Sequence, residues 1–166
     1  MTNRPSPLAI LTGIVLIVLP FVGLGLKVIS FGWLLFFFLF GPIILFALGY
    51  ALQVVIAITG FFSAGGPVLS TTVRRRATIA AWLTSLAWVV FCIFLQDGGD
   101  TDYGSTFQVW LGVYSDGAIH DATDGLTLVV GALAGIVWFL AWVWLVVEWI
   151  VGLVLRRRGR LAASVG

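Results

Sequence analysis

The stretch LTLVVGALAGIVWFLAWVWLVVEWIVGLVL, residues 126–155, decides the fold of this chain. It carries one charged residue, Glu148, and three arginines follow it directly. Crossing about 30 Å of bilayer hydrocarbon takes about 20 helical residues, so the stretch is long enough to span. It is apolar on every face, without the alternation of a membrane β-strand, and backbone groups in lipid must pair within their own segment. The stretch therefore predicts a transmembrane α-helix.

The composition of the whole chain agrees with that prediction. Of its 166 residues 61% are apolar and 10% are charged, against about 25% charged in an ordinary soluble domain. The mean hydropathy is +1.14. These values exclude a soluble globule and a disordered chain, and a single cysteine, Cys92, excludes an intrachain disulfide.

Three further apolar stretches occupy residues 8–26, 31–62 and 77–95. We expect an all-α integral membrane protein whose four transmembrane helices form one antiparallel bundle, a single domain over residues 1–166. The first stretch should be retained, because no small-residue cleavage site follows it. The second is longer than a span needs, so we expect it to tilt or to lie partly in the interface. Pro20 and Pro42 each remove a backbone donor from a span.

The charges predict how the chain is threaded. Arginines precede the third span and follow the fourth, whereas the loop over residues 96–125 holds six aspartates and no basic residue. By the positive-inside rule the arginines are cytoplasmic, which puts both termini in the cytoplasm and the acidic loop outside a plasma membrane. The arginine runs are interpreted as topology and lipid-headgroup signals, and the preference for arginine indicates a prokaryotic source. The run members are Arg74, Arg75, Arg76, Arg156, Arg157 and Arg158.

The polar residues within the spans lie at a similar predicted depth in the membrane. Glu148, Gln53, Thr84 and Ser85 all lie a similar number of residues from the cytoplasmic ends of their helices. A carboxylate at this depth costs about 2.5–3.5 kcal/mol. We therefore predict that Glu148 turns inward and meets Gln53, or Thr84 and Ser85, in a polar layer. The layer is interpreted either as glue between helices or as a proton or cation site, and the third alternative is that Glu148 snorkels toward the cytoplasm.

The acidic loop carries a second candidate site. Asp116, His120 and Asp124 are spaced four apart and would share one face of a helix, where carboxylate and imidazole can hold a divalent cation. Between the turn-forming flanks, residues 107–114 alternate apolar and polar side chains, which predicts a short strand or a segment lying in the interface. A solvated loop without a bound ion is the alternative.

No catalytic motif, cofactor motif or haem ligand pair is found in the sequence, and the basic residues flank spans instead of forming a nucleic-acid face. We predict a non-enzymatic accessory or oligomeric subunit, without cofactor, that binds another membrane protein or a second copy through its helix faces. Two alternatives stay open. One is a cation or proton channel or transporter component that uses Glu148. The other is a metal-dependent membrane enzyme with its site in the outer loop.

Overall fold

The computed structural model describes residues 5–69, 71–99, 102–114 and 117–163. Four of its helices are long and apolar enough to cross a membrane, over Pro7–Ser30, Pro42–Phe62, Val73–Phe94 and Ala118–Leu161. The prediction of a mainly helical chain with four such helices is confirmed. Their ends differ from the predicted ranges, and those differences shape the candidate site.

Helix α1 (Pro7–Lys27) begins where the sequence supplies a cap. The Ser6 hydroxyl accepts a hydrogen bond from the Ala9 N–H, and Pro7 occupies the first turn, where a missing N–H costs nothing. Pro20 lies inside the helix. A short 3-10 helix, η1 (Val28–Ser30), continues the chain to the far end of the molecule.

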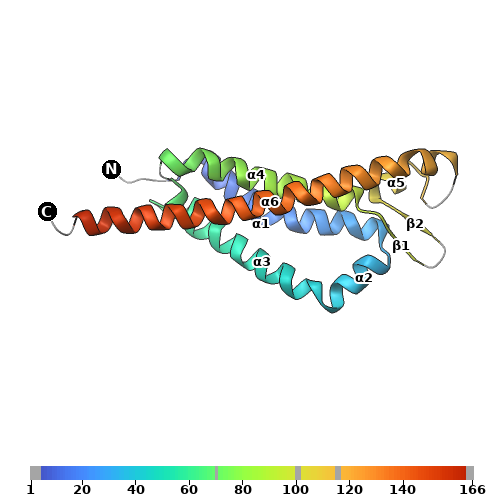
Figure 1. The fold of residues 1–166 in the computed structure, drawn as a ribbon, viewed down its shortest axis with the longest axis horizontal. Coiled ribbons are helices and arrows are strands. Elements are labelled where there is room, and N and C mark those ends of the chain that lie inside the picture. Colours follow the sequence, from blue (N-terminus) through green and yellow to red (C-terminus); the bar gives the residue numbers. More distant parts are fainter. Residues whose placement is uncertain (1–4, 70, 100–101, 115–116, 164–166) are drawn as a thin grey trace.

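The apolar stretch 31–62 is not one helix. It is divided into α2 (Trp33–Phe40), α3 (Pro42–Ile56) and a π-helical turn, η2 (Ala57–Phe62). The break falls at Gly41, whose φ of −155° lies outside the helical region, and the following Pro42 has no N–H to continue the hydrogen-bond ladder of α2. We call α2 and α3 together the arm. In Figure 1, α2 leads away from the other helices and α3 returns toward them.

Helices α1, α4 (Thr71–Phe94) and α6 (Ala118–Ala163) form a layer in which α4 packs against both neighbours. Small residues allow this close approach. Ala77, Ala80 and Ala81 are fully buried on α4. A Cβ at Gly131 would lie 3.2 Å from the Phe94 carbonyl oxygen of α4. The 3-10 helix η3 (Pro67–Leu69) leads into α4 and also contacts α6.

The acidic end of the molecule holds a two-residue hairpin and a short helix. Strand β1 (Asp97–Gly98) pairs antiparallel with β2 (Tyr103–Gly104), Asp97 opposite Gly104. Helix α5 (Thr106–Trp110) follows, so the predicted strand over 107–114 is wrong. Ser105 and Gln108 form a capping box that satisfies two backbone donors, and this local cap overrides the alternating pattern.

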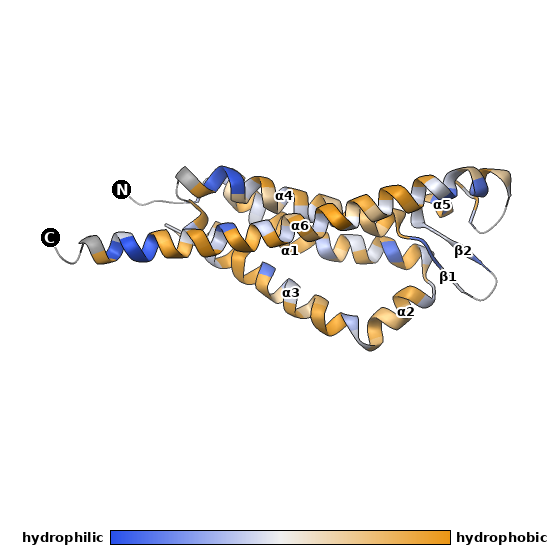
Figure 2. Ribbon diagram, in the orientation of Figure 1, coloured by the Kyte–Doolittle hydropathy of each residue, from blue (hydrophilic) through white to orange (hydrophobic). Residues whose placement is uncertain are grey.

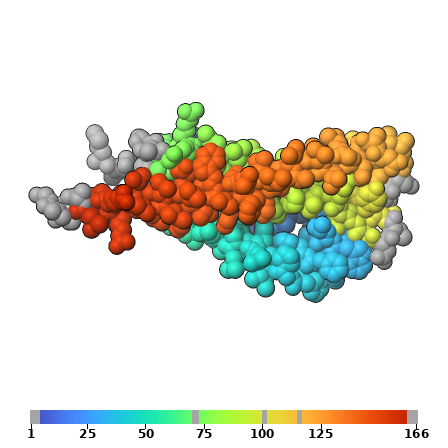
Figure 3. All heavy atoms as spheres, viewed as in Figure 1, coloured from blue at the N-terminus to red at the C-terminus, as the bar shows by residue number. Residues whose placement is uncertain are grey.

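Polar residues gather at the two ends of the molecule, with orange helices between them (Figure 2). Arginines lie at the end shared by the start of α4 and the end of α6. Helix α6 runs along one face for the length of the molecule and projects beyond the layer at the arginine end (Figure 3).

Candidate functional site: a groove under the arm

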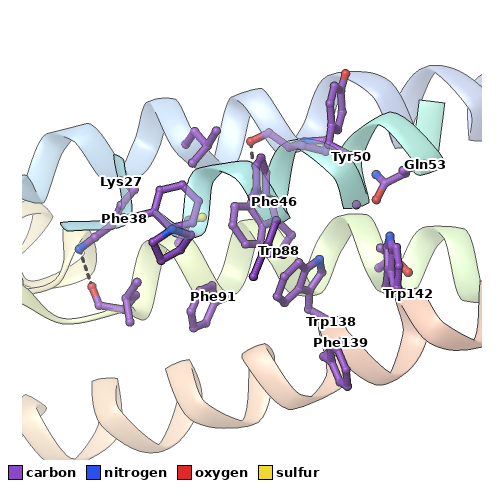
Figure 4. A pocket seen from close by; sticks show the side chains of 18 of the residues that line it. Lys27, Phe38, Phe46, Tyr50, Gln53, Trp88, Phe91, Trp138, Phe139 and Trp142 are labelled. Atoms are coloured by element: carbon purple, nitrogen blue, oxygen red, sulfur yellow. Dashed lines mark hydrogen bonds between the residues drawn. The ribbon is translucent and has the colours of Figure 1, made fainter. Parts of the chain in front are cut away.

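A groove of about 470 Å³ lies between the arm and the helix layer. Helix α4 contributes Trp88 and Phe91, α6 contributes Trp138 and Trp142, and α3 contributes Phe46, among the side chains that line it. Figure 4 shows these aromatic rings reaching into the space between α3, α4 and α6. Of the described residues that line the groove, Lys27 is the one that carries a charge. The groove is thus an apolar, aromatic site with polar groups near its two ends.

The aromatic wall is a connected set of rings. The Trp88 ring centroid lies 5.0 Å from that of Phe46 and 4.8 Å from that of Trp138. The Phe91 ring stacks with Trp138 at 6.3 Å. The Trp88 indole N–H donates to the Pro20 carbonyl at 3.1 Å, which fixes this ring between α1 and α4. Contacts of this kind contribute beyond simple burial and hold the lining rigid.

Pro20 explains the polar contacts at the end of the groove farther from the hairpin. Because proline has no N–H, the carbonyl of Leu16, four residues earlier, loses its helical donor. The Gln53 side-chain amide of α3 donates to this carbonyl at 2.7 Å. One turn away, the Tyr50 hydroxyl donates to the Ile17 carbonyl at 3.0 Å. These two bonds hold the inner part of the arm on α1.

A buried cluster that we call the latch lies at the end of the groove nearest the hairpin, where Lys27 lines the groove: Lys27, Ser30, Asp97 and Thr106. The Lys27 ammonium donates to the Leu95 carbonyl at 2.8 Å, to the Ser30 hydroxyl at 3.0 Å and to the Ser30 carbonyl at 3.3 Å. Its nitrogen lies 3.8 Å from Asp97 Oδ2, and the two side chains are 2% and 1% exposed. The Thr106 hydroxyl donates to the Leu26 carbonyl and contacts Ser30. The latch therefore joins α1, η1, β1 and α5, and it holds the residue that follows α4.

Asp97 also caps the arm. Its Oδ1 accepts from the Leu34 N–H at 2.8 Å, and its Oδ2 accepts from the Leu35 N–H at 2.9 Å. These are two of the donors that the first turn of α2 cannot satisfy internally, and the helix dipole favours a carboxylate there. Gly32 permits this approach, since a Cβ at that position would lie 2.4 Å from the Gly98 nitrogen.

The predicted polar layer does not form as one set of hydrogen bonds. Glu148 does turn inward and is 4% exposed, but its Oε1 pairs with Arg76 Nε at 3.0 Å and accepts from the Trp144 indole at 3.0 Å. Gln53 and Thr84 line the groove instead, and the Thr84 hydroxyl donates to the Ala80 carbonyl. Ser85 Oγ and Glu148 Oε2 are buried without a hydrogen-bond partner in the described part of the chain. In the sequence Arg76 lies before the predicted third span. In the structure Arg76 pairs with the Glu148 carboxylate, in place of the predicted partners Gln53, Thr84 and Ser85.

The predicted metal ligands are only partly described, because Asp116 lies outside the described residues. His120 is buried, its Nδ1 lies 3.1 Å from the Val113 carbonyl, and its Nε2 lies 4.0 Å from Asp124 Oδ1. That aspartate oxygen already accepts from the Gln96 amide. Among residues 5–69, 71–99, 102–114 and 117–163, no group of three or more potential metal ligands is found.

Tyr114 lies near the same end, where its hydroxyl donates to the Asp97 carbonyl at 3.3 Å. Burial raises the pKa of its phenol, and the charges of Asp97 and Asp102 add to the shift. The phenol therefore keeps its proton and stays a donor over the physiological pH range.

The arginine runs share one end of the molecule (Figure 2). Arg76 pairs with Glu148, and Arg74 donates to the Ser6 hydroxyl. The remaining members of the two runs are exposed: Arg75, Arg156, Arg157 and Arg158.

The latch was not predicted from the sequence. A signal was present, since Lys27 is the one lysine of the chain and follows the first apolar stretch on the side where the positive-inside rule disfavours cations. A cation in such a position needs an anionic partner nearby. The six aspartates of the loop over residues 96–125 are the candidates. Which of them pairs with Lys27 depends on the chain path through β1.

Comparison with protein families, with curated proteins and with solved structures finds no significant match to this chain.

Proposed function

We propose that this chain is a non-enzymatic integral membrane protein that acts by binding a lipid-soluble molecule in the groove under the arm. The observation that carries the proposal is the groove itself, which is apolar, aromatic and bounded by helices long enough to cross a membrane. Small-molecule sites in proteins commonly enclose about 300–1,000 Å³ with a few placed polar groups, and the groove falls within that range.

The lining of the groove favours a small molecule over a partner helix, because the arm and the helix layer both contribute aromatic side chains to it and so enclose it from two sides. The accessory role, in which a second membrane protein or another copy packs on the outer helix faces, stays a prediction beside this one.

The threading that accompanies the proposal places both termini in the cytoplasm of a prokaryotic plasma membrane. Its support is the separation of charge, with the arginine runs at one end of the molecule and the latch and acidic hairpin at the other (Figure 2). The helices between these ends then form a bundle in lipid, and the groove opens toward the bilayer between the arm and α6.

The transport alternative has weaker support. An ion pathway needs an acid that is free to exchange its cation, whereas Glu148 is paired with Arg76 and bonded to Trp144. The enzyme alternative, a metal site in the outer loop, also has weaker support, because Asp124 Oδ1 already accepts from the Gln96 amide and lies 4.0 Å from His120 Nε2. Binding is the activity that the geometry favours.

A pair of glycine variants tests the proposal. Gly49 lines the groove, and its nearest groove neighbour is Trp142 at 3.7 Å, so Gly49→Phe should fill the groove without displacing backbone. Gly25 on α1 is exposed with open space around it, so Gly25→Phe is the matched control. We expect native mass spectrometry from mild detergent to detect a small lipid-soluble molecule on the wild type and on Gly25→Phe, and to find it lost from Gly49→Phe. Equal retention by Gly49→Phe would refute the proposal.

A labelling experiment tests the threading. In a Cys92→Ala background, a single cysteine replacing Asp102 should react with a membrane-impermeant maleimide in intact cells, and one replacing Arg158 should react after permeabilisation only. The reverse pattern would show that the orientation is wrong.

A further inference from the structure

Six of the eight tryptophans lie on α4 and α6, and their indole N–H groups differ in hydrogen bonding. Four indoles donate to oxygens within the chain: Trp82 to Thr12, Trp88 to Pro20, Trp144 to Glu148 and Trp149 to Thr59. Trp138 and Trp142 are half-buried and line the groove, yet neither indole N–H has an acceptor in the described part of the chain. In Figure 4 both rings rise from α6 with their nitrogens on the side that faces α3. The groove therefore presents two unused donors.

The depth of these donors limits what can satisfy them. The midpoint of the apolar stretch 126–155 falls between residues 140 and 141, so Trp138 and Trp142 lie within about 4 Å of the bilayer centre at 1.5 Å per residue. The headgroup boundary is about 15 Å away. No bulk water reaches this depth, and an N–H without an acceptor in such a place costs free energy comparable to a lost hydrogen bond.

Ordinary phospholipids do not meet this requirement. Their acyl chains have no hydrogen-bond acceptor, and their ester carbonyls stay near the headgroups. The occupant must therefore be a molecule that dissolves wholly in the bilayer and carries an oxygen acceptor on the part that reaches the centre. The wall formed by Phe46, Trp88, Phe91 and Trp138 adds a second requirement, because aromatic walls favour a flat ring that can stack or meet them edge-on.

We propose that the groove binds a quinone-type molecule: a planar ring with carbonyl oxygens that accept from the Trp138 and Trp142 indoles, attached to an apolar tail. This inference rests on the proposed function and specifies its ligand class. The ring lies against the aromatic wall, and the tail leaves the groove toward the bilayer between the arm and α6. Binding is the whole of the proposal, and no electron or proton transfer is part of it.

Two probes separate this inference from the proposed function. A decyl-substituted benzoquinone and decylbenzene share the tail and a flat ring, but the quinone alone carries acceptors. Dissociation constants are measured for both by ligand-induced thermal stabilisation of the full-length protein in mild detergent. Trp138→Phe and Trp142→Phe each delete one N–H and keep an aromatic ring, and Trp110→Phe, on an indole outside the groove, is the matched control.

We expect the quinone to bind the wild type more tightly than decylbenzene does. Each groove substitution should weaken quinone binding roughly 2- to 10-fold, the range for losing one hydrogen bond. Decylbenzene binding should change less than 2-fold in the same variants, and Trp110→Phe should alter neither probe.

Each contrary result has its own meaning. If both probes bind equally and the tryptophan substitutions have no effect, the quinone inference is wrong while the groove function stands. If neither probe binds, the quinone inference is wrong, and native mass spectrometry of Gly49→Phe decides the proposed function. If Gly49→Phe leaves the binding of both probes unchanged, the proposed function fails and the inference fails with it. Should a tryptophan variant not fold, ¹⁵N NMR of the wild type replaces it: the quinone must shift two of the eight indole N–H signals, and decylbenzene must not shift them downfield.

Discussion

The latch makes a quantitative prediction, because its two charges are almost completely removed from solvent. Lys27 and Asp97 are 2% and 1% exposed, with the ammonium nitrogen 3.8 Å from Asp97 Oδ2. Lys27→Met keeps an unbranched side chain and removes the cation. Asp97→Asn keeps the shape of the side chain and removes the anion. Each single variant leaves one buried charge without its counter-ion, and the double variant leaves neither.

Breaking a buried ion pair from one side costs about 3–5 kcal/mol. The two sides of the latch are not equivalent. After Lys27→Met the Asp97 carboxylate still accepts from the Leu34, Leu35 and Gly98 N–H groups, at a helix N-terminus that favours an anion. We therefore expect Lys27→Met to lower the free energy of unfolding by about 3 kcal/mol, the low end of that range. After Asp97→Asn the ammonium retains neutral oxygens alone, so we expect a loss near 5 kcal/mol in the free energy of unfolding.

A double-mutant cycle isolates the pair. We expect the free energy of unfolding of the double variant to fall by about 2–3 kcal/mol less than the sum of the two single losses. This coupling energy is at the upper end of the range for residues in contact. Unfolding is followed by SDS titration in mixed micelles, with thiol labelling of Cys92 as the reporter. Cys92 is the one cysteine of the chain and is 2% exposed in the fold. Additive losses, within about 0.5 kcal/mol, would refute the assigned ion pair. Arg75→Gln, on an exposed arginine, should change the free energy of unfolding by less than about 0.5 kcal/mol.

Two further predictions use the same titration. Gly152→Leu should lower the free energy of unfolding by about 1–3 kcal/mol, because a Cβ there would lie 2.5 Å from the Pro67 carbonyl oxygen. Gly159 has open space around it, so Gly159→Leu should not change the free energy of unfolding measurably. Gln53→Leu should lose about 1–3 kcal/mol by leaving a helix carbonyl without a donor. Adding Pro20→Ala should recover most of that loss, since it restores the backbone N–H that this carbonyl lacks, and absence of recovery would contradict the role given to Gln53.

The sequence was sufficient for the four apolar helices, because hydropathy over a span depends little on what the span packs against. It was not sufficient for the path between them. The pair Gly41–Pro42 is visible in the sequence, but proline is common enough in membrane helices that a kink and a full break look alike. In the structure the arm is broken at Gly41 and held at both ends by Asp97, Tyr50 and Gln53. These contacts join residues far apart in the chain, so the local sequence does not reveal them.

The candidate site shows the same limit. Depth along a helix correctly indicated that Glu148 faces inward, but depth does not give the direction of a neighbouring helix. Arg76 was assigned to topology and lipid headgroups, yet it lies one helix away from Glu148 and pairs with it at 3.0 Å. Likewise Trp138 and Trp142 share one face of α6, but the bonded indoles find their acceptors on α1, on η2 or on α6 itself, and spacing along the helix does not reveal which indoles are left without one.

The arrangement of the arm explains why a groove persists in this fold. Asp97 fixes the start of α2 at the outer end, and Gln53 and Tyr50 fix α3 on α1 at the inner end. The break at Gly41 lies between these attachments, and α2 has no buried residue. Because both attachments are polar and directional, the bend of the arm at Gly41 cannot collapse onto α4 and α6 without breaking one of them. The same bonds that stabilise the arm therefore keep open the space in which we propose that a ligand binds.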